Sequence, residues 1–145
     1  MKSKTNEALK LLLDVPNIDV NIVNNDGESA LHVAASCDNS EAVELLLNVP
    51  NIDVNILDNQ GMSAVHQCIS GSMFGENIEV LKLLLAHPNL TTFTLNHKDK
   101  FEHSTPVMEA VKMNRLEELA VLIADLRVDL DTTDREGRSL EERAW

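Results

Sequence analysis

The octapeptide "VPNIDVNI" occurs at residues 15–22 and again, unchanged, at residues 49–56. The likeness extends to both sides, because "EALKLLLDVPNIDVNIVNNDG" at residues 7–27 aligns without gaps with "EAVELLLNVPNIDVNILDNQG" at residues 41–61. The two copies are therefore 34 residues apart. A fixed period of this size indicates a stack of repeated structural units, in which each unit contacts only its neighbours.

The register of this repeat continues to the end of the chain. Equivalent hydroxyl residues are separated by 34, 42 and 34 positions: Ser29, Ser63, Thr105 and Ser139. We expect a single repeat domain, residues 1–145, with units at about 1–26, 27–60, 61–102 and 103–136 and a partial unit at 137–145. The first unit lacks its opening helix and the last ends near its first helix. The chain is thus either a segment of a longer protein or an array with short caps.

Each unit reads as a turn followed by two short helices. In the second unit the hydroxyl of Ser29 can cap a helix that extends through Ala35. A second helix is predicted at about residues 41–48, where apolar residues recur at helical spacing, and Pro50 ends it. The chain then continues as an extended, hairpin-like finger whose turn contains Gly61.

The opening residues of three units resemble the T-P-L-H-x-A signature of the ankyrin repeat family. They are Ser29, Ala30, Leu31, His32 and Ala34; Ser63, Ala64, Val65, His66 and Cys68; and Thr105, Pro106, Val107, Met108 and Ala110. The family's A-D-V-N element is similar to "IDVN" at residues 18–21 and 52–55. The resemblance implies an all-α repeat solenoid, an ankyrin-type stack of helix-turn-helix units with hairpin-like fingers, that binds other proteins. It also gives His32 and His66 a structural role, hydrogen bonding between neighbouring units.

The chain is acidic, and its charges are unevenly distributed. Its formal net charge is −12, and no Lys or Arg lies between Lys10 and Lys82. An acidic surface repels phosphate groups, so we expect neither nucleic acid nor an anionic membrane as a partner. Two cysteines, Cys37 and Cys68, are too few for a disulfide scaffold, and no secretory or membrane-spanning segment is evident. We therefore expect an intracellular protein, cytoplasmic or nuclear.

We expect no enzymatic activity, no cofactor and no metal site. The sequence has no G-x-S-x-G elbow, no phosphate loop ending in Gly-Lys-Ser/Thr and no H-E-x-x-H. His32 and Cys37 are five residues apart, wider than the usual spacing of paired zinc ligands. In "DLDTTDREG" at residues 129–137, Asp134 occupies the sixth position, where a calcium loop needs glycine.

The third unit carries eight more residues than its neighbours. The alignment places about four of them near residues 70–77 and about four within residues 91–104, where they are expected to lengthen a finger. His103 stands where the other fingers have a turn glycine, and Lys98, Lys100 and Phe101 lie nearby in an otherwise acidic protein. The segment either contacts a partner directly or is a loop expansion without a partner.

Two asparagines fit a pattern of modification. The spacing Leu-x5-Asp-Val-Asn occurs at Leu13 to Asn21 and at Leu47 to Asn55. It resembles the ankyrin pattern that asparaginyl hydroxylases modify at the Asn. The alternative is that each Asn side chain only supports its finger.

We expect partner-binding residues on the finger tips and the inner helices, where side chains can vary without disturbing the stack. The candidates are Asn24, Asn25, Asp26 and Glu28; Asp58, Asn59, Gln60 and Met62; His97, Lys98, Asp99, Lys100, Phe101 and Glu102; and Gln67, Glu109, Lys112 and Met113. Their carboxylates predict a basic or mixed-charge protein or peptide partner, with Phe101 as an apolar anchor. We expect a monomer; the alternatives are a regulatory or targeting domain of a larger protein and a self-associating array.

Overall fold

The computed structural model describes residues 2–71 and 78–144, with side chains from residue 6 onward. The regular structure in these two ranges is entirely helical. The helices are α1 (Lys2–Leu13), α2 (Ala30–Ser36), α3 (Ser40–Leu47), α4 (Ala64–Ser70), α5 (Glu79–Ala86), α6 (Thr92–Leu95), α7 (Pro106–Lys112), α8 (Leu116–Ala124) and α9 (Leu140–Arg143). The expected all-α repeat stack is confirmed.

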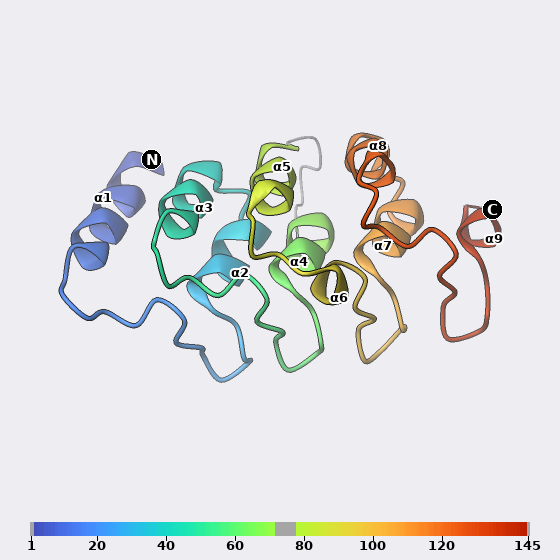
Figure 1. Ribbon diagram of the computed structural model, residues 1–145, viewed down its shortest axis with the longest axis horizontal. Helices are drawn as coiled ribbons and strands as arrows, with labels where there is room; N and C mark the ends of the chain where they lie inside the picture. Colours follow the sequence, from blue (N-terminus) through green and yellow to red (C-terminus); the bar gives the residue numbers. More distant parts are fainter. Residues whose placement is uncertain (1, 72–77, 145) are drawn as a thin grey trace.

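The helices form two rows that run the length of the molecule (Figure 1). One row consists of α2, α4, α7 and α9, and the other of α1, α3, α5 and α8. Within a unit the two helices pack on each other, as α2 does on α3, and successive units pack row on row, as α2 does on α4. The extended segments between units project from one edge of the stack and form the fingers (Figure 1). The two termini lie at opposite ends of the stack.

Several helices begin at a residue whose side chain caps them, whereas α5 and α8 have no hydrogen bond from a capping side chain. Ser29 precedes α2, and its hydroxyl accepts a hydrogen bond from the backbone N–H of His32. Ser63 and Thr105 do the same for α4 and α7. Asn39 caps α3 by accepting from the N–H of Ala42. The helices predicted at residues 29–35 and 41–48 are therefore present, with ends shifted by about one residue.

The core is a continuous layer of aliphatic side chains between the two rows. Leu46, Leu84 and Leu122 lie at equivalent points of α3, α5 and α8, and each is at most 2% exposed. Their equivalent in α1, Leu12, is 54% exposed, and its neighbour Leu11 is 71% exposed. The difference agrees with the packing of the helices, since α3 packs on α2 of its own unit, whereas no helix precedes α1 among the described residues.

The structure corrects the expected position of one insertion. Asn55 lies four residues after Asn51, whereas its counterpart Asn96 lies seven residues after Asn89, and the three additional residues form part of α6. Only one further residue enters the finger's turn. The insertion at residues 91–104 thus mainly adds a short helix before the finger. The other predicted insertion, at residues 70–77, falls largely outside the described residues.

Candidate protein-binding surface

Four finger tips share one hydrogen-bonded turn. We define them as finger 1 (tip residues 24–28), finger 2 (58–62), finger 3 (99–104) and finger 4 (134–138). In finger 2 the N–H of Asp58 donates to the carbonyl of Met62 at 2.9 Å, and the Asp58 carboxylate accepts from the N–H groups of Gln60 and Met62, both at 2.9 Å. Asn24, Asp99 and Asp134 occupy the equivalent place in the other tips.

This turn corrects two expected contact residues. Asp58 and Asp99 were predicted to face solvent, but their residues are only 8% and 7% exposed. Each carboxylate satisfies backbone N–H groups that the sharp turn would otherwise leave unpaired. Both side chains therefore hold the tips in shape, and the exposed positions of the tips lie beside them.

His32 and His66 connect neighbouring units, as expected. In His66 the ring Nδ1 accepts from the backbone N–H of Ser63 at 3.2 Å, so Nε2 carries the proton and donates to the carbonyl of Ser104 at 3.0 Å. His32 repeats this arrangement with Ser29 and Met62. Burial lowers the pKa of His66 to about 4, because a second ring proton would have to be desolvated and would face the N–H of Ser63.

A row of asparagine amides also joins the units. Asn21 donates to the carbonyl of Asn51 at 2.8 Å and accepts from the N–H of Asp53 at 2.8 Å. Asn55 makes the same pair of bonds with the next unit. The structure thus shows both amides in the supporting role, and their hydroxylation stays a prediction.

The third member of this row is Asn96, which sequence reasoning missed. Its amide donates to the carbonyl of Arg127 at 2.8 Å and accepts from the N–H of Asp129 at 2.8 Å. The helix α6 displaces Asn96 from the 34-residue register, so the period does not identify it. The sequence contains one local signal for Asn96, because "TLN" at residues 94–96 precedes finger 3 as "DVN" at residues 53–55 precedes finger 2.

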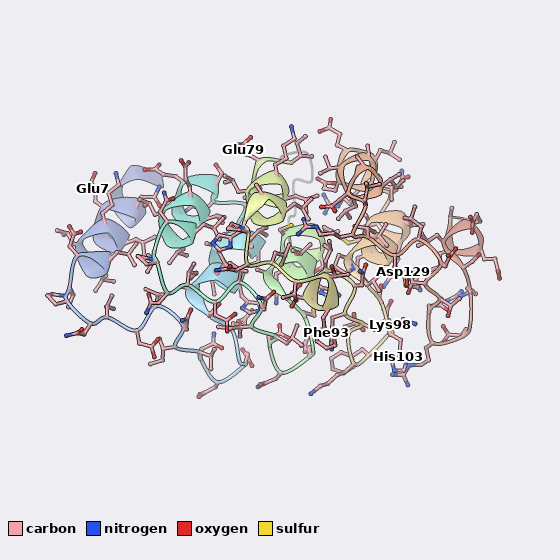
Figure 2. All side chains as sticks on the ribbon, in the orientation of Figure 1. Glu7, Glu79, Phe93, Lys98, His103 and Asp129 are labelled. Atoms are coloured by element: carbon pink, nitrogen blue, oxygen red, sulfur yellow. The ribbon has the colours of Figure 1, made fainter. Side chains whose placement is uncertain are left out.

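Exposed basic and aromatic side chains gather at finger 3, where Figure 2 labels Lys98 and His103. Phe101 is 66% exposed, and Lys98 and Lys100 are exposed beside it. The Lys98 ammonium donates to the carbonyl of Thr133 at 2.7 Å, which ties it to finger 4. His103 has φ 52°, the left-handed conformation that glycine adopts in the other three tips, so its expected place in the turn is confirmed.

The remaining tip candidates divide by exposure. Those that are exposed are Asn24, Asn25, Asp26, Asn59, Gln60 and Glu102. Those that are half-buried are Glu28, Met62 and His97. The ring of His97 bonds through Nδ1 to the carbonyl of Gly61 at 3.0 Å and meets Phe93 edge-on.

The inner-helix candidates also differ in access. Glu109 is only 7% exposed, which corrects its expected role as a contact residue: it lies on α7 between neighbouring first helices. Gln67 donates to the carboxylates of Asp58 at 2.9 Å and Glu28 at 3.3 Å, so its amide is hydrogen-bonded to residues of fingers 1 and 2. Lys112 is exposed and Met113 is half-buried.

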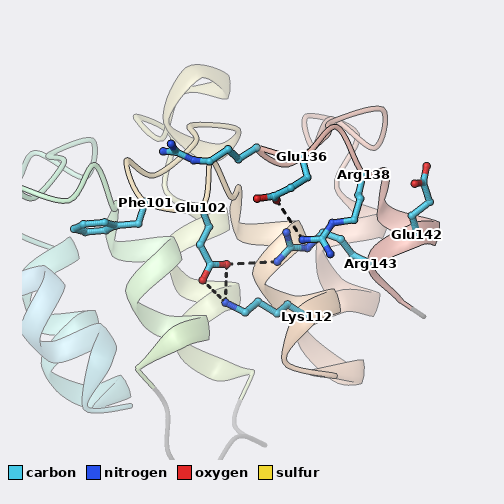
Figure 3. Close-up of a pocket in the computed structure, with 8 residues that line it drawn as sticks. Phe101, Glu102, Lys112, Glu136, Arg138, Glu142 and Arg143 are labelled. Carbon is cyan, nitrogen blue, oxygen red and sulfur yellow. Dashed lines mark hydrogen bonds and ion pairs between the residues drawn. The ribbon is translucent and has the colours of Figure 1, made fainter.

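A cleft of about 540 Å³ lies between fingers 3 and 4 and the helices α7 and α9 (Figure 3). It is lined by Phe101, Glu102, Lys112, Arg135, Glu136, Arg138, Glu142 and Arg143. Figure 3 shows Glu102 held between Lys112 and Arg143, and the hydrogen bond from Lys112 lowers the pKa of Glu102. The arginines of this cleft were not among the expected contact residues. They lie in the last units, where no motif distinguished them.

Asp134 forms the buried base of this cluster. Burial alone would raise its pKa, but hydrogen bonds from the backbone and side chain of Arg138 and from Arg143 outweigh it and lower the pKa to about 2. Arg143 approaches the carboxylate at 2.7 Å, and Arg138 approaches it at 2.8 Å. Asp134 is thus charged at neutral pH and holds two arginines at the edge of the cleft.

No group of three or more His, Cys, Asp or Glu side chains is placed to hold a metal ion in the described ranges. Cys37 is exposed and Cys68 is buried, both as free thiols, and burial raises the pKa of Cys68. Among the described helices, none is long and apolar enough to cross a membrane.

Comparison with known proteins identifies the repeat. Residues 1–93 match a family model described as ankyrin repeats, three copies. The match includes α1 to α5 and fingers 1 and 2, and it ends within α6. A search of curated proteins gave no match to the chain.

Proposed function

The chain belongs to the ankyrin repeat family, and we propose that it is a non-catalytic protein-binding module that contacts its partner through the finger tips and the adjoining face of the first helices. Ankyrin repeats generally mediate interactions between proteins. We further propose that the protein acts in the cytoplasm or nucleus, as an adaptor or as the interaction domain of a larger protein.

The observation that supports this proposal is that the finger residues fall into two sets, one that holds the stack together and one that is exposed to solvent. One set is buried and bonded to the stack, as Asp58 and Asp99 are. A second set is exposed at equivalent places on successive tips: Asn25, Asn59, Lys100 and Arg135. The backbone N–H of each of the last three bonds to the preceding finger, so their positions are fixed while their side chains differ. A rigid surface with variable chemistry suits selective recognition of a protein.

Self-association is the second candidate, and the exposed Leu11 and Leu12 at one end of the stack favour it. In that case the end face would be covered by another copy, and the mass in solution would rise with concentration. The finger surface would then have no specific partner.

The proposal is tested by capture from a cell lysate with the native chain and with the variant Lys98→Ala/Lys100→Ala/Phe101→Ala. We expect the native chain to retain a defined protein that the variant loses, since Phe101 is the exposed aromatic of the tips. The matched control is Lys10→Ala/Lys82→Ala/Leu126→Ala, which removes two lysines and an exposed apolar side chain from sites away from the tips.

Retention by the control and loss by the finger variant support the proposal. Equal capture by all three proteins would show that finger 3 makes no contribution to binding. Absence of any specific partner for the native chain would contradict the proposed function itself.

A further inference from the structure

Some charged residues of the fingers have no ionic partner, and the sign of these charges changes along the stack. In finger 1 the carboxylates of Asp26 and Glu28 have no cation within ion-pair distance in the part of the chain that the structure describes. Glu28 is bonded only to neutral amides, those of Asn24 and Gln67. Finger 1 therefore presents negative charge without an ionic partner, whereas the exposed tip residues of finger 2, Asn59 and Gln60, are neutral.

Fingers 3 and 4 present the opposite charge. Lys98 and Arg135 each donate to a backbone carbonyl at 2.7 Å, a neutral acceptor that leaves their charge in place. Lys100 is exposed, and among the described residues no carboxylate pairs with it.

Of the three glutamates that line the cleft, two pair with cations, and Glu142 accepts from the hydroxyl of Ser139. Glu102 pairs with Lys112 at 2.6 Å, and Glu136 pairs with Arg138 at 3.3 Å. Asp134 is buried between Arg138 and Arg143. The charge left without an ionic partner around Phe101 is therefore mainly cationic, although the chain as a whole has a net charge of −12.

The reversal follows structurally equivalent positions. The residue whose carbonyl closes the turn is Glu28, Met62, Ser104 and Arg138 in successive tips, and it changes from acid to base. The second residue of each tip changes from neutral to basic along the stack: it is Asn25, Asn59, Lys100 and Arg135 in successive fingers. Because the fingers lie side by side along one edge (Figure 1), the surface has a basic half at fingers 3 and 4, and another half in which finger 1 is acidic and the exposed tip residues of finger 2 are neutral.

The basic half also has a recess for a side chain. The cleft between fingers 3 and 4 has the exposed Phe101 on one wall and Arg135 on its lining. At its edge the Arg143 side chain is only 6% exposed, and its Nε has no hydrogen-bond partner among the described residues. A short acidic side chain on a partner would meet cations and an apolar wall there together.

We propose that the partner presents a segment of mixed charge, whose basic part lies over finger 1 and whose acidic part lies over fingers 3 and 4, with an acidic side chain in the cleft. This inference rests on the proposed protein-binding function and adds the charge order of the partner. Charges more than about 10 Å apart are largely screened at 0.1 M salt, so each half of the surface selects its own part of the segment. Complementary potentials then fix the orientation of the partner.

The probes that test this order are three synthetic peptides with blocked ends: one with lysines in serine, one with glutamates and a leucine in serine, and one that joins the two. Amide chemical shifts of the isotope-labelled full chain report where each peptide binds. We expect the acidic peptide to shift residues 98–102 and 133–138, and the basic peptide to shift residues 24–28. The joined peptide should bind about tenfold or more tightly than either part, because the second contact becomes intramolecular.

The variant Lys98→Glu/Lys100→Glu should weaken the acidic peptide by roughly tenfold, as expected for the loss and reversal of two exposed contacts. The control Lys10→Glu/Lys82→Glu makes the same change in net charge away from the tips and should bind that peptide nearly as the native chain does. Equal losses in both variants, shifts of the acidic peptide at residues 24–28, or no shifts at the tips from either peptide would overturn the inference. If the native chain still captures a protein in the lysate experiment, only the charge order fails, and the proposed function stands.

Discussion

At the scale of the residue, the buried His66 combines a structural bond with sensitivity to acid. His66 donates to the carbonyl of Ser104 and accepts from the N–H of Ser63, so only the neutral ring satisfies both partners. Burial lowers its pKa from 6.5 to about 4. The unfolded chain therefore binds a proton below pH 6.5 that the folded chain does not bind until about pH 4, and stability is lost as the pH falls between these values.

The loss attributable to His66 should reach about 3 kcal/mol, since each pH unit between the two pKa values is worth about 1.4 kcal/mol. It is measured as the free energy of urea unfolding at neutral pH and near the lower pKa. The control is His66→Gln, whose amide can still donate to the carbonyl of Ser104 but does not titrate. The variant should lose less stability on acidification, and equal losses in the two proteins would contradict the assigned role of His66.

At the scale of the element, the four tips share one turn but differ in the residue at its left-handed position. Gly27, Gly61 and Gly137 have φ near 78°, whereas His103 has φ 52°. Left-handed backbone costs a side-chain-bearing residue roughly 1–2 kcal/mol, and glycine costs about 0.5–1 kcal/mol in additional unfolded-chain entropy. Because the first cost is larger, His103→Gly should raise the free energy of unfolding by about 1 kcal/mol.

Two reverse substitutions provide the comparison for His103→Gly. A Cβ on Gly137 would meet nothing within 4 Å, so Gly137→Ala tests the backbone conformation alone. A Cβ on Gly27 would lie 2.8 Å from the backbone nitrogen of Asn59, so Gly27→Ala should cost more than Gly137→Ala. If both cost the same in chemical unfolding, the close packing of fingers 1 and 2 does not contribute to stability.

At the scale of the whole molecule, the stacking of the units places acidic finger residues at one end of a surface and basic finger residues at the other. Each exposed ion pair with a partner is worth about 0.2–1 kcal/mol, so a few such pairs contribute about 1–2 kcal/mol. Once a partner is identified, its affinity should fall roughly fivefold to tenfold between low and physiological ionic strength. Isothermal titration at the two salt concentrations measures this change, and an unchanged affinity would remove electrostatics from the account of recognition.

The sequence by itself determined the repeat period, the caps at Ser29 and Ser63 and the left-handed turn at His103, and its resemblance to the family implied the bridging role of His32 and His66. The caps and the turn depend on residues close together in the chain, and the bridges join adjacent units of the repeat. Only the tertiary structure decided which polar candidates are accessible: it buries Asp58, Asp99 and Glu109 and leaves Phe101 exposed. It also moves Asn96 into the asparagine row through α6.

The cleft likewise required the three-dimensional stack, since Phe101, Lys112, Arg135 and Arg143 come from separate elements of different units. The physical reason is that burial, ion pairing and the shape of a recess depend on which segments stack against one another. Capping and turn formation depend mainly on the immediate neighbours in the chain.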